Sequence, residues 1–257
     1  MQNLFRKSLV ERKFTLGAWM QIGHPSIAEI FCRHGFDWIC VDMEHGAIDI
    51  ETAANIFRTI EKYNTIPIAR LPQNDPVWIH RILDAGAQGL IIPMVKNAKE
   101  AENAVCQAKY PPRGIRGFGY SRANTHGIDF DNYIKTANDE IAMIMQIEHK
   151  DAIDNLEGML NIDGVDGVFL GPLDLSGSMG IPGQLEHPDM LKYLETFRQL
   201  SFKSGKSFGL HVIRPNEENI RATIALGYNF IALGLDVVHL HESSKKTYNI
   251  ASKLKKK

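Results

Sequence analysis

The stretch WICVDMEHG, residues Trp38–Gly46, decides the fold of this chain. Its leading residues are mostly apolar and indicate a buried strand, and Asp42, Glu44 and His45 then arrive together where that strand should end. In parallel α/β proteins, ligands bind at the carboxyl ends of the strands. The stretch therefore predicts a parallel sheet whose functional groups follow its strands.

Outward from this stretch, a short apolar strand followed by a helical segment recurs along the chain. The expected strands begin near Thr15, Trp38, Ile66, Gly89, Ile141, Gly164, Ser207 and Phe230. Eight strand–helix units in 257 residues favour a closed (β/α)8 TIM barrel over an open doubly wound sheet. We expect one barrel domain over residues 1–257, with the tail from Val237 forming the eighth helix.

Residues 111–140 break this alternation for about thirty positions. The segment contains four glycines and two adjacent prolines, and it carries Arg113, Arg116 and Arg122. Long excursions from compact domains are usually lids, binding loops or oligomer contacts. A surface loop with solvated arginines is the alternative, and the sequence leaves both open.

The composition points to small-molecule chemistry. A formal charge of −1, from 29 basic and 30 acidic residues, gives no field that would recruit nucleic acid or an anionic membrane. We expect Cys32, Cys40 and Cys106 to be reduced thiols without a disulfide. No segment resembles a secretory signal or a membrane span, so we expect a cytoplasmic protein.

Polar residues at the expected strand ends form the candidate site. They are Gln21, Asp42, Glu44, His45, Arg70, Gln146, Glu148, Asp174, His211 and Asp236. Glu148 and Asp174 follow consecutive strands and are candidates to hold a divalent cation, although a salt bridge or solvated loop is the better explanation for a pair of acids chosen at random. No Gly-rich phosphate loop or serine elbow occurs, which disfavours nucleotide cofactors and catalytic triads.

Arg70 and His45 extend this hypothesis. A guanidinium at the end of an apolar strand either pairs with a barrel carboxylate or binds an anionic substrate such as an oxoacid. Histidine is the residue type whose unperturbed pKa lies near neutral pH, and His45 is a candidate general base that Asp42 or another acid could orient. A structural histidine satisfied by backbone carbonyls is the alternative. The glycine after His45 indicates a tight turn.

Five ordered motifs, VDMEHG, PIARLP, YPPRGIRGFG, QIE and FLGPLDLSGSMG, make the chain similar to a known family. Over nearly its whole length it resembles the HpcH/HpaI aldolases, class II pyruvate aldolases related to 2,4-dihydroxyhept-2-ene-1,7-dioate aldolase. The resemblance implies a (β/α)8 barrel with Mg²⁺, Mn²⁺ or Co²⁺ bound by Glu148 and Asp174. It also implies a hexamer in which the last helix, from Val237 onward, swaps between neighbouring subunits.

The resemblance further implies roles for the other site residues. Arg70 would bind the carboxylate or keto oxygen of pyruvate, and His45 with Asp42 would form the general base system. Gln146 would lie near the metal and the substrate. The backbone amides around Gly171, Pro172, Leu173 and Asp174 would help to hold the carboxylate.

The expected reaction is reversible cleavage of a 4-hydroxy-2-oxoacid to pyruvate and an aldehyde through an enolate. The family also includes enzymes that condense an enolate with a different oxoacid, such as siderophore citrate synthases. A Schiff-base aldolase using Lys96 or Lys150 is a second alternative. A catalytically silent barrel that serves as a binding or assembly subunit is a third.

Overall fold

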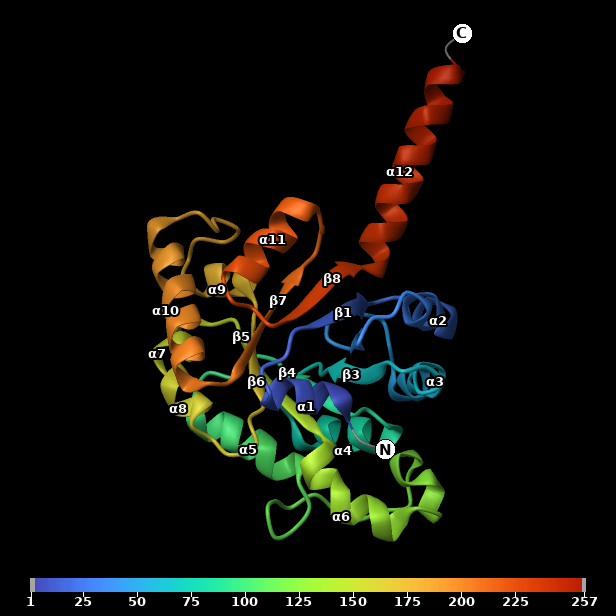
Figure 1. Ribbon diagram of the computed structural model, residues 1–257, viewed down its shortest axis with the longest axis vertical. Helices are drawn as coiled ribbons and strands as arrows, with labels where there is room; N and C mark the ends of the chain where they lie inside the picture. Colours follow the sequence, from blue (N-terminus) through green and yellow to red (C-terminus); the bar gives the residue numbers. More distant parts are fainter. Residues whose placement is uncertain (1–2, 256–257) are drawn as a thin grey trace.

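The computed structural model describes residues 3–255, and its centre is a closed barrel of eight parallel strands in sequence order (Figure 1). The strands are β1 (Thr15–Met20), β2 (Trp38–Asp42), β3 (Ile66–Arg70), β4 (Gly89–Ile92), β5 (Ala142–Ile147), β6 (Gly167–Leu170), β7 (Ser207–Val212) and β8 (Phe230–Leu235). The barrel closes where β8 pairs with β1. The predicted (β/α)8 fold is confirmed.

Strand β2 shows how the strands create two cores. Side chains of a strand point alternately to opposite faces. Ile39 and Val41 pack outward among helical residues, whereas Trp38 and Cys40 lie in a separate cluster inside the barrel with residues such as Ile68. All of these side chains are fully buried. An almost continuous apolar run is the sequence signature of a strand that is covered on both faces.

Most barrel helices lie where their sequence signals place them. They are α2 (Pro25–Arg33), α3 (Ile50–Ile60), α4 (Pro76–Ala85), α5 (Ala98–Ala108), α10 (Pro188–Ser204), α11 (Glu217–Ala225) and α12 (Asp236–Leu254). Helix α11 begins at the predicted cap, because the side chain of Asn216 accepts from the amide of Asn219 at 2.8 Å. Helix α4 ends at Gly86, whose φ of 107° suits glycine.

Two segments depart from a simple alternation of one strand and one helix. The segment after β5 forms two short helices, α7 (Lys150–Asp154) and α8 (Leu156–Leu160). The segment after β6 begins with an additional short helix, α9 (Pro172–Ser178). The first of these breaks at Asn155, which has a non-helical φ of −107° and ψ of 9°. Helix α9 starts with a proline, which is common at the first position of helices, but its many small residues make the helical pattern hard to recognise in the sequence.

The segment 111–140 contains the 3₁₀ helix η1 (Arg122–Gly127) and the helix α6 (Phe130–Glu140). It joins the end of α5 to the start of β5, so it lies at the amino-terminal end of the barrel. Arg116 is buried and pairs with Asp84 at 2.7 Å. Arg122 pairs with Glu61. These arginines fasten the segment to the barrel, so solvated arginines and a lid over the carboxyl ends of this chain are both wrong interpretations.

Helix α12 projects away from the barrel (Figure 1), and its side chains are mostly exposed. Among them are Leu240 and Tyr248, with exposed fractions of 61% and 70%. The predicted eighth helix is therefore present, while its exchange between subunits stays a prediction. The last two lysines lie outside the described residues.

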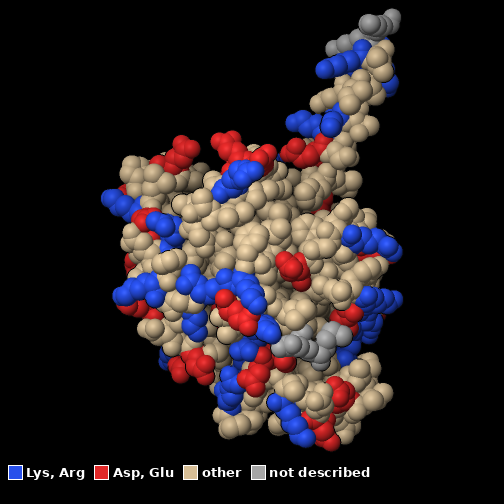
Figure 2. All heavy atoms as spheres, viewed as in Figure 1, with Lys and Arg blue, Asp and Glu red and all other residues tan. Residues whose placement is uncertain are grey.

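The surface carries both signs of charge, interspersed over the face seen in Figure 2. This pattern agrees with the formal charge of −1. Cys32 and Cys40 are buried, Cys106 is partly buried, and all three are free, as expected. Within residues 3–255, no helix is both long and apolar enough to cross a membrane.

A helix that the sequence did not predict, α1 (Leu4–Val10), closes the amino-terminal end of the barrel. Phe5 and Leu9 are 1% exposed and belong to the cluster inside the barrel. The ring of Phe5 lies 5.3 Å from that of Trp38 and 6.1 Å from that of Phe230. The helix has only seven residues, which is too short for a clear periodic signal.

If α1 is the floor of the barrel core, Phe5→Ala will lower the free energy of unfolding by about 3–5 kcal/mol, because it opens a cavity among aromatic rings. Urea unfolding followed by circular dichroism measures the change. Leu4→Ala is the matched control, since Leu4 is 58% exposed and its loss should cost no more than about 0.5 kcal/mol. Equal stability of the two variants would contradict this assignment.

Candidate active site

The candidate site forms where the inward-facing rows of neighbouring strands change from apolar to polar residues. In β2, Trp38 and Cys40 lie inside the barrel, so Asp42, two residues further, also faces inward at the carboxyl end. Strand β3 repeats the pattern, with Ile68 followed by Arg70. The register pairs Asp42 directly with Arg70. Strand alternation therefore places the acid and the arginine side by side.

Strand β5 supplies the next row. Ala142 and Ile144 lie inside the barrel, and Gln146 and Glu148 continue the row toward the same end. Strand β1 contributes Trp19 and then Gln21 in the same way. Regular alternation thus explains why these polar side chains converge on the mouth of the barrel.

The carboxylate of Asp42 is fully buried and ties the site together. Arg70 donates to it from Nε at 3.0 Å and from Nη2 at 2.6 Å. Gln21 and Trp19 donate to its Oδ2 at 2.8 and 3.2 Å. Burial alone would raise the pKa of the Asp42 carboxyl, but the hydrogen bonds and charge of Arg70 outweigh burial and lower the pKa to about 2. Asp42 is therefore an anion.

The turn after β2 is built on the same carboxylate. The backbone amides of Glu44 and His45 donate to Asp42 Oδ1 at 3.1 and 3.2 Å. A Cβ at Gly46 would lie 2.3 Å from the carbonyl oxygen of Asp42, so only glycine fits there. The tight turn predicted from this glycine is present, and it presents the side chains of residues 44 and 45 at the rim.

The His45 ring is not oriented by Asp42, which corrects the expectation for this pair. Asp42 accepts from the amide of His45, whereas the ring Nε2 lies 4.0 Å from Glu44 Oε2. The side chain of His45 is 58% exposed at the cavity rim. An acid near the ring is therefore present, but it is Glu44. The structure leaves the imidazole accessible to a ligand.

Glu44 also approaches Arg70, with its Oε2 3.1 Å from Nη1. Burial raises the pKa of the Glu44 carboxyl, with the charge of Arg70 opposing and those of Asp42 and Asp174 adding to the rise. A guanidinium has five N–H donors. Hydrogen bonds to Asp42 engage two of them, and the contact with Glu44 is an ion pair without a hydrogen bond, so Arg70, which lines the cavity, keeps N–H donors for a ligand.

Glu148 is a buried carboxyl without a cationic partner. Its Oε1 accepts from the amide of Met94 at 2.7 Å, and its Oε2 accepts from Gln146 Nε2. Burial raises its pKa to about 7, and the charges of Glu44 and Asp174 contribute to the rise. Three acids from separate elements thus repel one another around one position.

The surroundings of Glu148 fit a divalent cation. Gln146 Oε1 is buried and has no hydrogen-bond partner, so an oxygen ligand is available beside the carboxylates. No group of three or more His, Cys, Asp or Glu side chains poised for a metal occurs among residues 3–255. Two carboxylates completed by water and substrate oxygens, as is usual for Mg²⁺, remain compatible with the site.

The cavity between these groups has a volume of about 200 Å³, which suits a small molecule. Its lining consists of Trp19, Gln21, His45, Arg70, Gln146, Phe169, Leu170, Gly171, Pro172, Leu173, Asp174, His211, Ile213 and Leu235. The start of α9 supplies four of these in sequence, ending in Asp174. The side chains predicted at the strand ends are therefore mostly brought together. Lys96 and Lys150 are outside this lining, which weakens the Schiff-base alternative.

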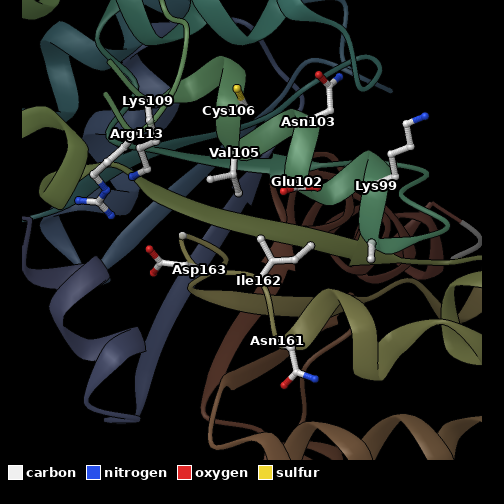
Figure 3. Close-up of a pocket in the computed structure, with 12 residues that line it drawn as sticks. Lys99, Glu102, Asn103, Val105, Cys106, Lys109, Arg113, Asn161, Ile162 and Asp163 are labelled. Carbon is white, nitrogen blue, oxygen red and sulfur yellow. The ribbon is translucent and has the colours of Figure 1, made fainter. Parts of the chain in front are cut away.

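A larger hollow of about 810 Å³ lies elsewhere, between α5 and the loop that follows α8 (Figure 3). Two of its three cationic residues have partners within residues 3–255. Lys109 donates to the carbonyls of Asn138 and Ile141 at 2.7 and 3.0 Å, and Arg113 pairs with Asp139 at 2.6 Å. None of the candidate residues at the strand ends lines this hollow.

The sequence profile of the HpcH/HpaI aldolase/citrate lyase family matches residues 15–243. The chain belongs to this family. A 4-hydroxy-2-oxo-heptane-1,7-dioate aldolase from Salmonella heidelberg (strain SL476) is 38% identical over 241 residues, which cover 93% of this chain and 91% of that protein. The relatives of this HpcH/HpaI chain are thus aldolases, which is the predicted enzyme class.

Solved structures agree with this assignment. An HpcH/HpaI aldolase/citrate lyase family protein from Burkholderia cenocepacia J2315 has a TM-score of 0.93 at 30% identity, covering 98% of this chain and all of that one. The citrate synthase SbnG has a TM-score of 0.86 at 26% identity, with 98% of each chain covered. Class II aldolases of this family generally depend on a divalent metal.

In the metal-free protein, the unfolding free energy will fall as pH rises through about 7, because the raised pKa of Glu148 means that its charged form is disfavoured in the folded state. Because the pKa of Glu148 is raised from the ordinary value of 4.5 to about 7, the unfolding free energy is lower by roughly 3 kcal/mol above pH 8 than at acidic pH. Glu148→Gln will lack this loss. Urea unfolding between pH 5 and 8 in EDTA measures both proteins.

Glu102→Gln is the matched control, since Glu102 is exposed on α5. Its unfolding free energy should follow the wild-type pH dependence. Parallel curves for wild type and Glu148→Gln would show that Glu148 carries no raised pKa.

Proposed function

We propose that this protein is a divalent-metal-dependent class II aldolase that reversibly cleaves a 4-hydroxy-2-oxoacid to pyruvate and an aldehyde. The observation that carries the proposal is one small cavity lined by Arg70, Gln146 and Asp174, with the buried carboxyl of Glu148 directly behind Gln146. Within residues 3–255 no cation pairs with Glu148 or Asp174, so these acids suit a metal ion, and an arginine in the same lining suits an oxoacid anion.

Glu148 and Asp174 are the residues that would hold Mg²⁺, Mn²⁺ or Co²⁺. Such an ion, when bound, stabilises the negative charge that develops as pyruvate becomes an enolate. Gln146 orients Glu148 through its amide and has an unpaired oxygen beside it. Met94 holds the other carboxylate oxygen. These contacts fix the acid before a ligand arrives, which lowers the cost of organising the site.

Arg70 binds the carboxylate or the 2-oxo oxygen of the oxoacid and stabilises enolate charge. Asp42 and Glu44 hold the guanidinium in one position, and its face lies 5.1 Å from the ring of Trp19. Burial would lower the pKa of Arg70, but the hydrogen bonds and charge of Asp42 raise it above its ordinary value. The guanidinium therefore stays charged throughout the reaction.

His45 takes the proton of the 4-hydroxyl group as the bond between carbons 3 and 4 breaks and the aldehyde leaves. In the direction of synthesis, it returns that proton. Glu44, and not Asp42, is the acid beside the ring. Asp42 acts on the reaction by holding Arg70 and the turn that carries His45. The backbone around Gly171, Pro172 and Leu173 would help to hold the substrate carboxylate.

Condensation of an enolate with another oxoacid is the second candidate. The similarity to the citrate synthase SbnG favours it, because the two chains match over 98% of their lengths. Both reactions use the same enolate half of the site. A comparison of aldehydes and oxoacids as acceptors for pyruvate separates them, and faster reaction with an oxoacid would favour condensation.

We also infer that residues 1–257 form a single domain and that the protein acts in the cytoplasm as a homo-oligomer. The one closed barrel supports the first inference. The exposed apolar residues of α12, Leu240, Ile250 and Leu254 among them, support an oligomer in which this helix packs on another subunit. Sedimentation of wild type and a chain ending before residue 237 would test the hexamer.

EDTA will abolish release of pyruvate from 4-hydroxy-2-oxoacids, and Mg²⁺, Mn²⁺ or Co²⁺ will restore it, because the enolate charge then lacks its counterion. A coupled assay of pyruvate measures this. Borohydride added with pyruvate should trap no covalent adduct on Lys96 or Lys150. Full activity in EDTA would sink the metal-dependent mechanism, and a trapped adduct would favour the Schiff-base alternative.

His45→Ala will lower kcat by roughly 10²–10⁴-fold, the usual contribution of a general base. Its affinity for Mn²⁺ will remain at the wild-type value, because Glu148 and Asp174 are intact. Asp174→Asn is the contrasting variant and should lose Mn²⁺ affinity. Electron paramagnetic resonance of Mn²⁺ measures binding. Collapse of metal binding in His45→Ala would show that the roles are divided differently.

A further inference from the structure

His211 lines the same cavity but has no part in the enolate chemistry described above. It is at the carboxyl end of β7, and its ring stacks on Trp19 with centroids 4.8 Å apart. The ring of Trp19 also stacks on that of Phe169, with centroids 5.5 Å apart. The imidazole is therefore held against an aromatic part of the cavity lining.

The hydrogen-bond partner of His211 determines its tautomer. Its Nε2 lies 2.8 Å from the carbonyl oxygen of Gly234, which only accepts, so Nε2 carries the hydrogen. Burial lowers the pKa of His211 to about 4, with the bond to Gly234 opposing and the charge of Arg70 adding to the fall. The ring is therefore neutral near pH 7, and its Nδ1 is an acceptor.

The position of this carbonyl depends on a bulge in β8. The register between β1 and β8 shifts, because Gly17 pairs with Ala232 while Trp19 pairs with Leu235. Gly234 lies in that bulge with φ of 71°. A Cβ there would come within 2.0 Å of the His239 ring, so glycine is required. The bulge thus sets which nitrogen of His211 keeps its lone pair.

The lone pair of Nδ1 is available to a ligand. Within residues 3–255 Nδ1 has no hydrogen-bond partner, and it is not among the buried polar atoms that are closed off from solvent. Beside His211, β8 and the residue that follows β7 contribute Leu235 and Ile213 to the cavity, and both are apolar. His211 therefore offers one fixed acceptor on an otherwise apolar part of the lining.

We propose that His211 selects aldehydes that carry a hydroxyl group. The inference rests on the proposed aldolase function and names its acceptor class. His45, which takes the proton of the 4-hydroxyl group, and His211 line the same small cavity, so the aldehyde fragment is enclosed by a lining that includes His211. A hydroxyl donates to Nδ1, whereas a carboxylate meets a lone pair and is repelled. The chain thus differs from relatives named for a seven-carbon dioate, whose cleavage leaves an aldehyde with a carboxylate.

Pyruvate release from three substrates, in Mg²⁺, tests the proposal. The substrates are 4,5-dihydroxy-2-oxopentanoate, 4-hydroxy-2-oxopentanoate and 4-hydroxy-2-oxoheptane-1,7-dioate. The first two differ only in the hydroxyl of the leaving aldehyde. We expect kcat/KM to favour the first over the second by about tenfold, the usual effect of one hydrogen bond, and to be lowest for the dioate.

His211→Leu should lower the ratio of kcat/KM between the first two substrates by about tenfold, because leucine cannot accept. His211→Gln keeps an acceptor oxygen and should retain part of the preference. His187→Asn is the control, since His187 only caps α10 and asparagine also caps helices. Its ratio should equal that of wild type.

Exchange of the methyl protons of pyruvate in D₂O separates this inference from the proposed function, because it reports enolate formation without an acceptor. If exchange occurs, any of three results would overturn the role of His211. They are equal cleavage of the first two substrates, preferential cleavage of the dioate, and a wild-type ratio of kcat/KM between the first two substrates in His211→Leu. Absence of both exchange and cleavage would overturn the aldolase function itself.

Discussion

The buried pair of Asp42 and Arg70 is the interaction on which the rest of the site depends. Removing two charges from water is costly, and an unpaired member of such a pair typically costs 3–5 kcal/mol. Here the carboxylate offsets that cost by accepting from two guanidinium nitrogens, two side chains and two backbone amides. The amides belong to the turn that carries His45. The same anion thus fixes the guanidinium of Arg70 and the backbone of that turn.

This arrangement leaves negative charge on the acids of the site unbalanced, and that charge favours the binding of a cation. Arg70 is shared between Asp42 and Glu44, and among the residues that the structure describes, 3–255, no cation pairs with Glu148 or Asp174. Burial then opposes the charge of Glu148, as its raised pKa of about 7 records. A divalent ion relieves the repulsion and removes the need for a proton. The site is therefore arranged around a charge that the protein does not supply.

Strand alternation and helix-terminal signals made much of this predictable from the sequence. Because inward positions recur every two residues, Asp42, Arg70 and Gln146 had to converge once the strands were assigned. The partner of the His45 ring was not predictable, since it depends on how a turn folds back on Asp42. Helix α1 was also missed, because seven residues carry little periodicity and its stability comes from contacts with distant strands.

The two halves of the cavity are set by different parts of the barrel. Regular strands β2, β3 and β5, with the start of α9, position the groups for enolate chemistry. His211 and its partner carbonyl come from β7 and β8, where the bulge at Gly234 interrupts the register. A change at residue 211 therefore alters the cavity lining without removing a hydrogen bond of Arg70 or Glu148. The barrel can therefore keep the same enolate chemistry while the acceptor changes. In this chain, residue 211 is the position at which the choice of acceptor is joined to the cavity that carries the reaction.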